Sequence, residues 1–212
     1  MKILHVTPLY YPAVGGVESV FKAVSEGMAQ RGEDVTVFTT TGRSLNAFMN
    51  PAVRPLVAGE EIISGVRVRR FPYRRVLRLA ARVFSRGWSA LHLLKGEDFI
   101  AWSALPWVPG LSSEIAAYKP DVVLAGHFPT RIVYEASEAR KAAGFPLVYF
   151  TALHLGHGAD MPGSSLELLK GADAAWVSTS YEKAALQKSG IAENKIWDLG
   201  VGIHPDDFKK GD

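Results

Sequence analysis

Two adjacent glycines near the N-terminus have the position of an anion-binding turn. Gly15 and Gly16 follow a short apolar run that ends at Val6, and a helical pattern starts directly after them. A strand, a glycine turn and a helix in this order direct free helix amides toward a bound anion, usually a phosphate. The alternative is a tight turn that only lets the helix pack closely. Eight residues separate the turn from the run, whereas a dinucleotide fingerprint begins almost at once, so a nicotinamide or flavin enzyme is disfavoured.

Imidazoles and hydroxyls gather at the ends of other predicted strands. The residues that follow the first strand and three later strands in this way are Tyr10, His127, His154, His157 and Ser180. In an open parallel sheet, ligands bind outside the carboxyl ends of the strands. We therefore expect these side chains to line one cleft together with the glycine turn. For His127 the residues alone favour a structural histidine that bonds a neighbouring loop, with a place in the cleft as the alternative.

The motifs do not support metal or hydrolase chemistry. His154 and His157 lie close to Asp160, but no second ligand cluster accompanies them, and no D-x-D sequence is present to cradle a metal-bound sugar nucleotide. We expect no bound metal. The chain has no cysteine, which excludes disulfides and thiolate zinc sites, and it has no G-x-S-x-G elbow of a serine hydrolase. Glu18 and Glu26 have E-x7-E spacing within the first helix, where we expect solvated side chains without a catalytic role.

The hydrophobic pattern predicts the elements that carry these residues. Besides the run before Val6, short apolar segments predict strands at 35–40, 121–125, 147–151, 174–178 and 195–199, and a hairpin at 60–71. Helical periodicity predicts helices after Gly16 and at 129–143, 165–170 and 181–189, while residues 43–59 have no clear period. This alternation indicates an α/β protein with a doubly wound, mostly parallel, Rossmann-like sheet and helices on both faces.

A predicted helical segment at 73–95 has an unusual charge. Between Gly65 and Lys95 there are eight arginines and no acidic residue. One face of the segment and its end carry Arg75, Arg78, Arg82, Arg86 and Trp88. Basic amphipathic helices of this kind lie on anionic membrane surfaces. The alternative is a solvated helix face. Nucleic acid is disfavoured because no stacking platform or base-reading motif accompanies the arginines.

The composition is that of an ordinary soluble globular protein, with 48% hydrophobic and 21% charged residues in 212. Two prolines interrupt the N-terminal run and no small-residue cleavage site follows, which indicates a strand rather than a signal peptide. The longest lipid-like segment, Phe99–Leu111, has 13 residues and two prolines, so it is too short and too broken to span a bilayer. We expect a cytoplasmic protein that can associate peripherally with the inner face of the membrane.

Six segments, taken in order, resemble one family. They are KILHVTPLYYPAVGGVE, RGEDVTVFTT, KPDVVLAGHF, PLVYFTALH, ADAAWVSTSYEKAAL and KIWDLGVGIHPDDF, and together they extend over nearly the whole chain. The set is similar to the start of retaining glycosyltransferases of the family-4 type, whose GT-B fold has two facing Rossmann-like domains. The resemblance implies that residues 1–198 are the N-terminal, acceptor-side domain, with a basic insertion at about 66–95. It also implies that residues 199–212 begin the hinge to a donor-binding domain that this chain lacks.

The same resemblance implies roles for the candidate residues. Gly15 and Gly16 would lie against the diphosphate of a nucleoside-diphosphate sugar, His154 would orient the transferred sugar, and His127 would lie in the cleft. The sugar would pass with retention to a lipid-linked or saccharide acceptor without an obligatory metal, and the chain alone would be inactive. The competing hypothesis is a stand-alone membrane-surface binding module of the same fold without catalysis.

Overall fold

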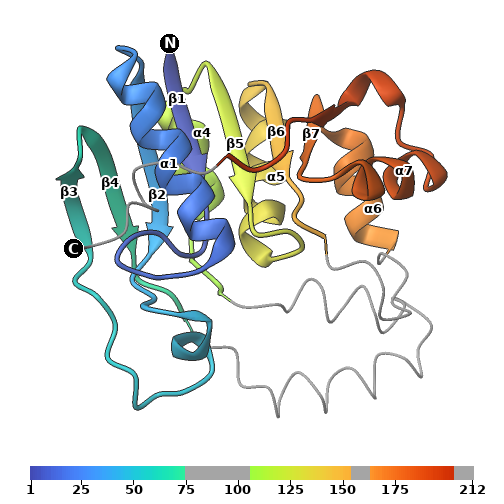
Figure 1. Cartoon of the computed structure of the whole chain (residues 1–212). Coiled ribbons are helices and arrows are strands. Elements are labelled where there is room, and N and C mark those ends of the chain that lie inside the picture. The colour runs from blue at the N-terminus through green and yellow to red at the C-terminus, as the bar shows by residue number, and fades with distance from the viewer. Residues whose placement is uncertain (75–105, 154–162, 203–212) are drawn as a thin grey trace, which may run out of the picture.

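A central sheet organises residues 1–74, 106–153 and 163–202, the part of the chain that the computed structural model describes (Figure 1). Its eight strands are β1 (Lys2–Val6), β2 (Asp34–Thr40), β3 (Gly59–Ile63), β4 (Val66–Phe71), β5 (Val122–Gly126), β6 (Leu147–Phe150), β7 (Ala174–Val177) and β8 (Ile196–Asp198). Their spatial order is β3-β4-β2-β1-β5-β6-β7-β8, and every neighbouring pair is parallel except the β3–β4 hairpin. Seven candidate residues lie outside the described ranges: Arg75, Arg78, Arg82, Arg86, Trp88, His154 and His157.

The order in which strands are added to the sheet reverses between β1 and β5. After β1 the chain moves outward through β2 to the hairpin, then returns to place β5 on the other side of β1, and β6 to β8 follow outward. Leu4 in β1 therefore pairs with Thr36 on one side and with Val123 on the other. Such a reversal defines the switch point of a doubly wound sheet. The predicted fold class, a mostly parallel Rossmann-like α/β domain, is confirmed.

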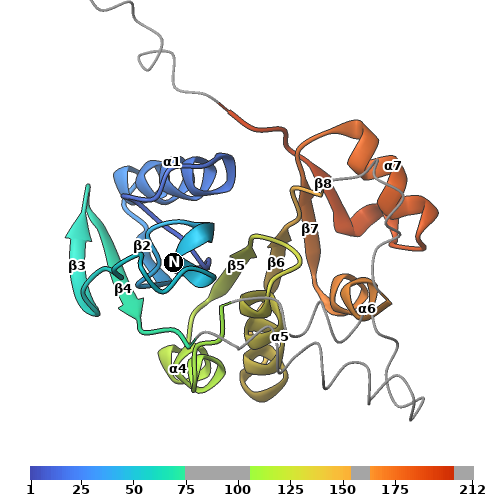
Figure 2. The ribbon, with the colours of Figure 1, turned by 90° about the horizontal axis from the view of Figure 1, so that it is seen from below.

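Helices cover both faces of the sheet (Figure 2). The five described α-helices are α1 (Gly16–Gln30), α4 (Leu111–Tyr118), α5 (Arg131–Ala143), α6 (Gly163–Gly171) and α7 (Ser180–Lys188). Because side chains alternate along a strand, β1 sends Ile3 into a core with Phe21 of α1, and Leu4 into a second core with Ile115 of α4 and Ile132 of α5. Figure 2 shows α1 on one side of the sheet and α4 and α5 on the other.

The structure differs from the predicted elements at several places. The helix α4 was not predicted, because its sequence LSSEIAAY buries only Leu111 and Ile115 and has little helical periodicity. The irregular stretch at 43–59 contains the short 3-10 helix η1 (Leu45–Phe48), and a second one, η2 (Glu193–Lys195), precedes β8. The helix predicted from residue 129 begins at Arg131, because its N-cap Thr130 is extended.

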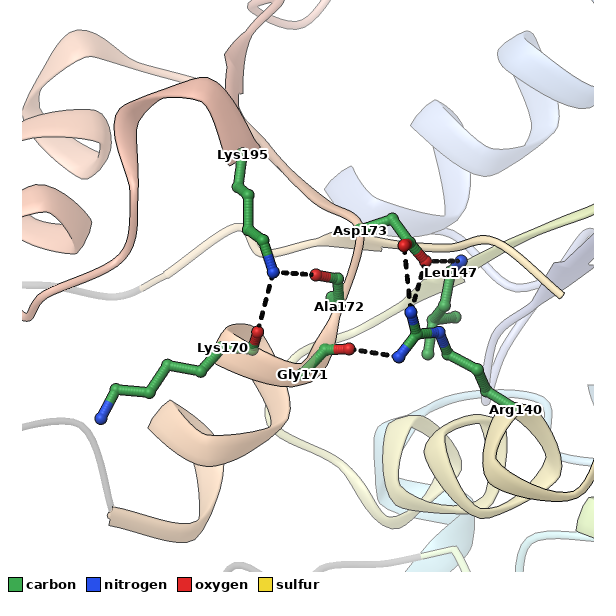
Figure 3. A network of polar contacts seen from close by, with 7 residues as sticks. All are labelled: Arg140, Leu147, Lys170, Gly171, Ala172, Asp173 and Lys195. Carbon is green, nitrogen blue, oxygen red and sulfur yellow. Dashed lines mark hydrogen bonds and ion pairs between the residues drawn. The ribbon is translucent and has the colours of Figure 1, made fainter. Parts of the chain in front are cut away.

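A polar network ties the helices to the amino ends of the later strands (Figure 3). Arg140 of α5 donates to the carboxylate of Asp173, which also accepts from the amide of Leu147 at 2.8 Å. The ammonium of Lys195 donates to the carbonyls of Lys170 and Ala172 at 3.0 and 2.8 Å, at the carboxyl end of α6, where a cation is favoured. The network lies at the edge of the sheet opposite the carboxyl ends, so it supports the fold away from the predicted cleft.

Candidate functional site

A pocket of about 600 Å³ lies at the switch point of the sheet. Its walls are the β1–α1 loop and first turn of α1, the helix η1, the residues after β5, β6 and β7, and Val201. Most of the lining is apolar, with a few polar groups from different elements, which is the usual composition of a small-molecule site. The structure thus brings Gly15, Gly16 and His127 together in one pocket, as the sequence predicted for the edge of the sheet.

Neither glycine is required by an unusual backbone, and only Gly15 has a close neighbour. Gly15 is the N-cap of α1 and is extended, with φ 176° and ψ 168°, a conformation that any residue adopts. A Cβ at Gly15 would lie 2.2 Å from Oε2 of Glu18, so a larger residue would collide with that carboxylate. A Cβ at Gly16 would meet nothing within 4 Å. Gly16 therefore leaves open space beside the first amides of α1, which have no acceptor within the helix.

Glu18 is a site residue that the sequence reasoning missed. We expected it to be solvated, and this expectation was wrong: the residue is 5% exposed and lines the pocket. Its carboxylate forms no hydrogen bond or ion pair with any residue in the described ranges. On the same helix, Oε2 of Glu26 pairs with Lys22 at 2.9 Å, while its Oε1 is buried without a partner among the described residues. The oxygens of Glu18 are instead accessible from the pocket, so a water or a ligand hydroxyl can bind them. The sequence did contain one indication of a role for Glu18. It lies in the first turn of the helix after Gly15-Gly16, where acidic residues are favoured.

His127 is held at the pocket by a strained backbone. Its φ is +65°, in the left-handed region that residues with a Cβ rarely adopt. It follows directly after the last residue of β5, and both His127 and Phe128 line the pocket. Such conformations cost on the order of 1–3 kcal/mol and persist mainly at binding and catalytic sites. The strain therefore favours a functional role for His127 over that of a structural histidine.

Two of the predicted cleft residues lie elsewhere. Tyr10 is fully buried in the core beneath α1 and does not line the pocket, and burial raises the pKa of its hydroxyl to about 12. Ser180 is exposed in the first turn of α7, while Ser178, two residues earlier, lines the pocket. A residue after a strand can point to the cleft or away from it, and only the path of the loop decides which.

A buried glutamate positions the loops after β6 and β7. Glu182 in α7 is 4% exposed, and its carboxylate accepts hydrogen bonds from the amides of Leu153 at 2.5 Å and Ser178 at 2.8 Å. Bonds from backbone amides to a carboxylate are charge-assisted and strong. Glu182 therefore fixes the end of β7 at the pocket and the residue that precedes His154. The spacing of Thr179 and Glu182 matches a capping box, so a local role of this carboxylate was readable from the sequence, whereas its bond to Leu153, 29 residues away, was not.

The chemistry of the pocket suits a ligand with both phosphate and hydroxyl groups. The amides at the N-terminus of α1 favour an anion, while Glu18 and His127 can exchange hydrogen bonds with hydroxyls. No group of three or more histidine, cysteine, aspartate or glutamate residues that could hold a metal occurs within residues 1–74, 106–153 and 163–202. His154, His157 and Asp160 lie outside those ranges, so their predicted roles stay predictions.

Comparison with known families agrees with this geometry. The family model described as "Glycosyl transferase 4-like domain" matches residues 15–197, which include the two glycines, η1 and the pocket residues after β5, β6 and β7. The search of curated proteins returned no match.

Solved structures share the fold. The Anabaena protein HepE, solved with UDP and glucose, has a TM-score of 0.61 and 13% identity over 100% of this chain and 47% of its own. The lipopolysaccharide outer core galactosyltransferase WaaB has a TM-score of 0.53 and 16% identity over 94% of this chain and 45% of its own. A UDP-GlcNAc 2-epimerase from Methanocaldococcus jannaschii has a TM-score of 0.51 and 13% identity over 95% and 46%. The chain spans about half the length of these proteins, and at such identities the likeness establishes the fold and not the reaction.

Proposed function

Because the chain belongs to the glycosyl transferase 4-like domain family, we propose that its pocket is the acceptor-side half of a glycosyltransferase site. The donor is a nucleoside-diphosphate sugar, and the acceptor is a saccharide or a lipid-linked sugar. One observation carries the proposal: the open space at Gly16 and the strained His127 meet in a pocket at the switch point of the sheet. The presence of UDP and glucose in the structure of HepE supports a nucleotide sugar as the ligand of this fold.

In this proposal each group of the pocket has a distinct role. The diphosphate lies against Gly16, where the free amides of α1 stabilise the negative charge that grows as it leaves. His154 orients the transferred sugar. Glu18 accepts a hydrogen bond from a sugar hydroxyl, and His127 contacts the sugar or acceptor. The acceptor oxygen bonds to the anomeric carbon on the face from which the diphosphate departs, and the hydroxyl proton leaves with the diphosphate, so the configuration is retained.

The substitution Gly16→Ala tests this role. The added Cβ meets no protein atom within 4 Å, so the fold accepts it, and an alanine in a helix is more stable than glycine by about 0.5–1 kcal/mol. The same methyl group would occupy the space proposed for the diphosphate. We expect UDP-glucose to bind the chain weakly, measured by saturation-transfer NMR, and at least tenfold more weakly after Gly16→Ala, without loss of thermal stability. Equal affinity in both proteins would place the diphosphate elsewhere.

Membrane contact is a second candidate function, supported by Arg75, Arg78, Arg82 and Arg86, which have no acidic residue among them in the sequence. The earlier arginines of the same run do not contribute, because Arg67, Arg69 and Arg70 pair with carboxylates within the fold. None of the helices in the described ranges is long and apolar enough to cross a bilayer. Contact at the inner face of the membrane would bring the site to a lipid-linked acceptor. Co-sedimentation with anionic liposomes should be abolished when Arg75, Arg78, Arg82 and Arg86 are changed to Glu. Equally poor binding to neutral and anionic liposomes would refute this second function.

A further inference from the structure

A second pocket, of about 450 Å³, lies on the other side of the β1–α1 loop, and we call it the outer pocket. The loop contributes Tyr11 and Pro12, the β3–β4 hairpin contributes Glu60, Glu61, Ile63 and Arg70, and residues 56–59 close the remaining side. Residues 14–16 of the same loop line the pocket at the switch point. One short loop therefore forms a wall shared by both pockets.

A buried guanidinium forms the base of the outer pocket. Arg70 is 5% exposed, although it lies in an outer strand of the sheet. Its Nε donates to Oε1 of Glu61 at 2.6 Å, and its Nη2 donates to the carbonyl of Tyr11 at 2.5 Å. Its Nη1 is also buried and has no hydrogen-bond partner among the described residues. An unsatisfied donor on a buried charged group is costly, so an oxygen atom from outside the chain is favoured there.

The other lining groups define the chemistry of the ligand. The carboxylate of Glu61 belongs to a side chain that is 50% exposed, and Tyr11 is 48% exposed beside Pro12. Glu60 pairs with Arg69 at 3.5 Å, and these two residues, opposite each other in the hairpin, lie on the face of the sheet away from Arg70. An anion is disfavoured, because Glu61 already matches the charge of Arg70. A purely apolar ligand would leave Nη1 of Arg70 without an acceptor.

A neutral ring with several hydroxyls suits both Glu61 and Arg70. Its hydroxyls donate to the Glu61 carboxylate and accept from the guanidinium in charge-assisted bonds. The apolar side of the ring covers Tyr11 and Pro12. We propose that the outer pocket is a second saccharide site, which binds a neutral pyranose ring.

Such a ring has two sources. It can be a sugar of the acceptor remote from the attacked hydroxyl, in a chain that crosses the β1–α1 loop, and this source rests on the proposed function. It can also be a free saccharide that binds independently of the cleft. The chemistry of recognition is the same in both cases, so the experiment must separate the sources.

Saturation-transfer NMR with a panel of glucose, maltose, cellobiose and lactose tests the site on the whole chain. We expect at least one of these saccharides to bind, and to bind about tenfold more weakly after Glu61→Gln, which removes one charge-assisted acceptor. Tyr11→Ala should weaken binding as well, while it keeps the carbonyl that holds Arg70. The matched control is Glu114→Gln, because Glu114 pairs with Arg69 of the same strand at 2.7 Å and is 44% exposed, but lies outside this pocket.

The outcomes separate this inference from the proposed function. If no saccharide of the panel binds, or if binding survives both Glu61→Gln and Tyr11→Ala, the outer site is refuted whatever UDP-glucose does. If UDP-glucose fails to bind but a saccharide binds and responds to the two variants, the outer site stands and the nucleotide-sugar proposal fails. If a disaccharide of the panel binds more tightly than glucose, the ligand extends beyond the outer pocket, which identifies an acceptor chain as the source; equal affinities identify a free saccharide.

Discussion

The hydrogen-bond partners of the buried polar residues near the site cannot be read from the residues next to them in the sequence. Glu182 accepts two backbone amides, whereas Glu18 has no partner among the described residues and opens on a pocket. His5 in β1 is fully buried, with Nδ1 2.7 Å from Oγ of Ser25. Since Ser25 donates its own proton to the carbonyl of Phe21 at 2.6 Å, the His5 ring donates through Nδ1 and leaves Nε2 without a proton.

This arrangement predicts a pH dependence of stability. Burial lowers the pKa of His5 from 6.5 to about 4, because the folded state disfavours the charged ring. Above pH 6.5 the ring is neutral in both states and its full contribution is present. As the pH falls from 6.5 toward 4, only the unfolded chain takes up the proton, so the free energy of unfolding decreases by up to about 3 kcal/mol.

Urea unfolding between pH 7.5 and 4.5 measures this effect. In His5→Gln the titrating ring is absent while all carboxylates remain, so the difference between the two pH profiles isolates the histidine. We expect the wild-type protein to lose more stability on acidification than the variant. Parallel profiles would show that His5 is not buried in its neutral form.

At the level of elements, α1 packs closely against the end of β5 beside the pocket. Gly126 ends β5, directly before His127, and a Cβ there would lie 2.3 Å and 2.4 Å from two ring carbons of Phe21 in α1. The ring of Phe21 is fully buried and meets Phe150 edge-on. The absence of a side chain at Gly126 thus lets α1 approach the switch point and bring its N-terminus across from His127.

Gly126→Ala should therefore be destabilising. Because the ring of Phe21 is enclosed, we expect a loss of about 1–3 kcal/mol from overpacking. Combining it with Phe21→Leu should cost less than the sum of the two single changes, since the smaller side chain makes room for the methyl group. Gly171→Ala is the control, because a Cβ there meets nothing within 4 Å. Additive losses in the double variant, measured by urea unfolding, would contradict the proposed contact.

At the level of the whole molecule, we propose that the site is one wall of a cleft. The chain spans about half the length of HepE and WaaB. A diphosphate held only by the N-terminus of α1 keeps its other side in water, where electrostatic attraction is weak. A second domain would exclude that water and strengthen every charge interaction within the site.

We accordingly expect the purified chain to show no turnover of UDP-glucose, assayed by release of UDP with saccharide acceptors present. Titration calorimetry should likewise detect no micromolar affinity for UDP-glucose. Turnover, or a micromolar Kd, would show that the second wall is not required.

The pattern of the sequence was sufficient for the order of strands and helices and for the position of the glycine turn, because both depend on residues within a few positions of each other. The strand run ending at Val6, the hairpin and the placement of His127 after a strand are all found in the structure. The family also follows from local segments in their order. The short helix α4 was not predicted, because its eight residues bury only two side chains and therefore show almost no helical period.

Only the tertiary structure decided what lines the two pockets. Glu18 and Tyr10 are both close to the glycine turn in sequence, yet Glu18 lines a pocket and Tyr10 is core. Arg70 reaches the carbonyl of Tyr11 across 59 positions. Burial and pairing depend on which loop lies over a side chain, and that is set by the order of strands in the sheet. No local pattern carries this information, since it arises from contacts between segments that are distant in the chain.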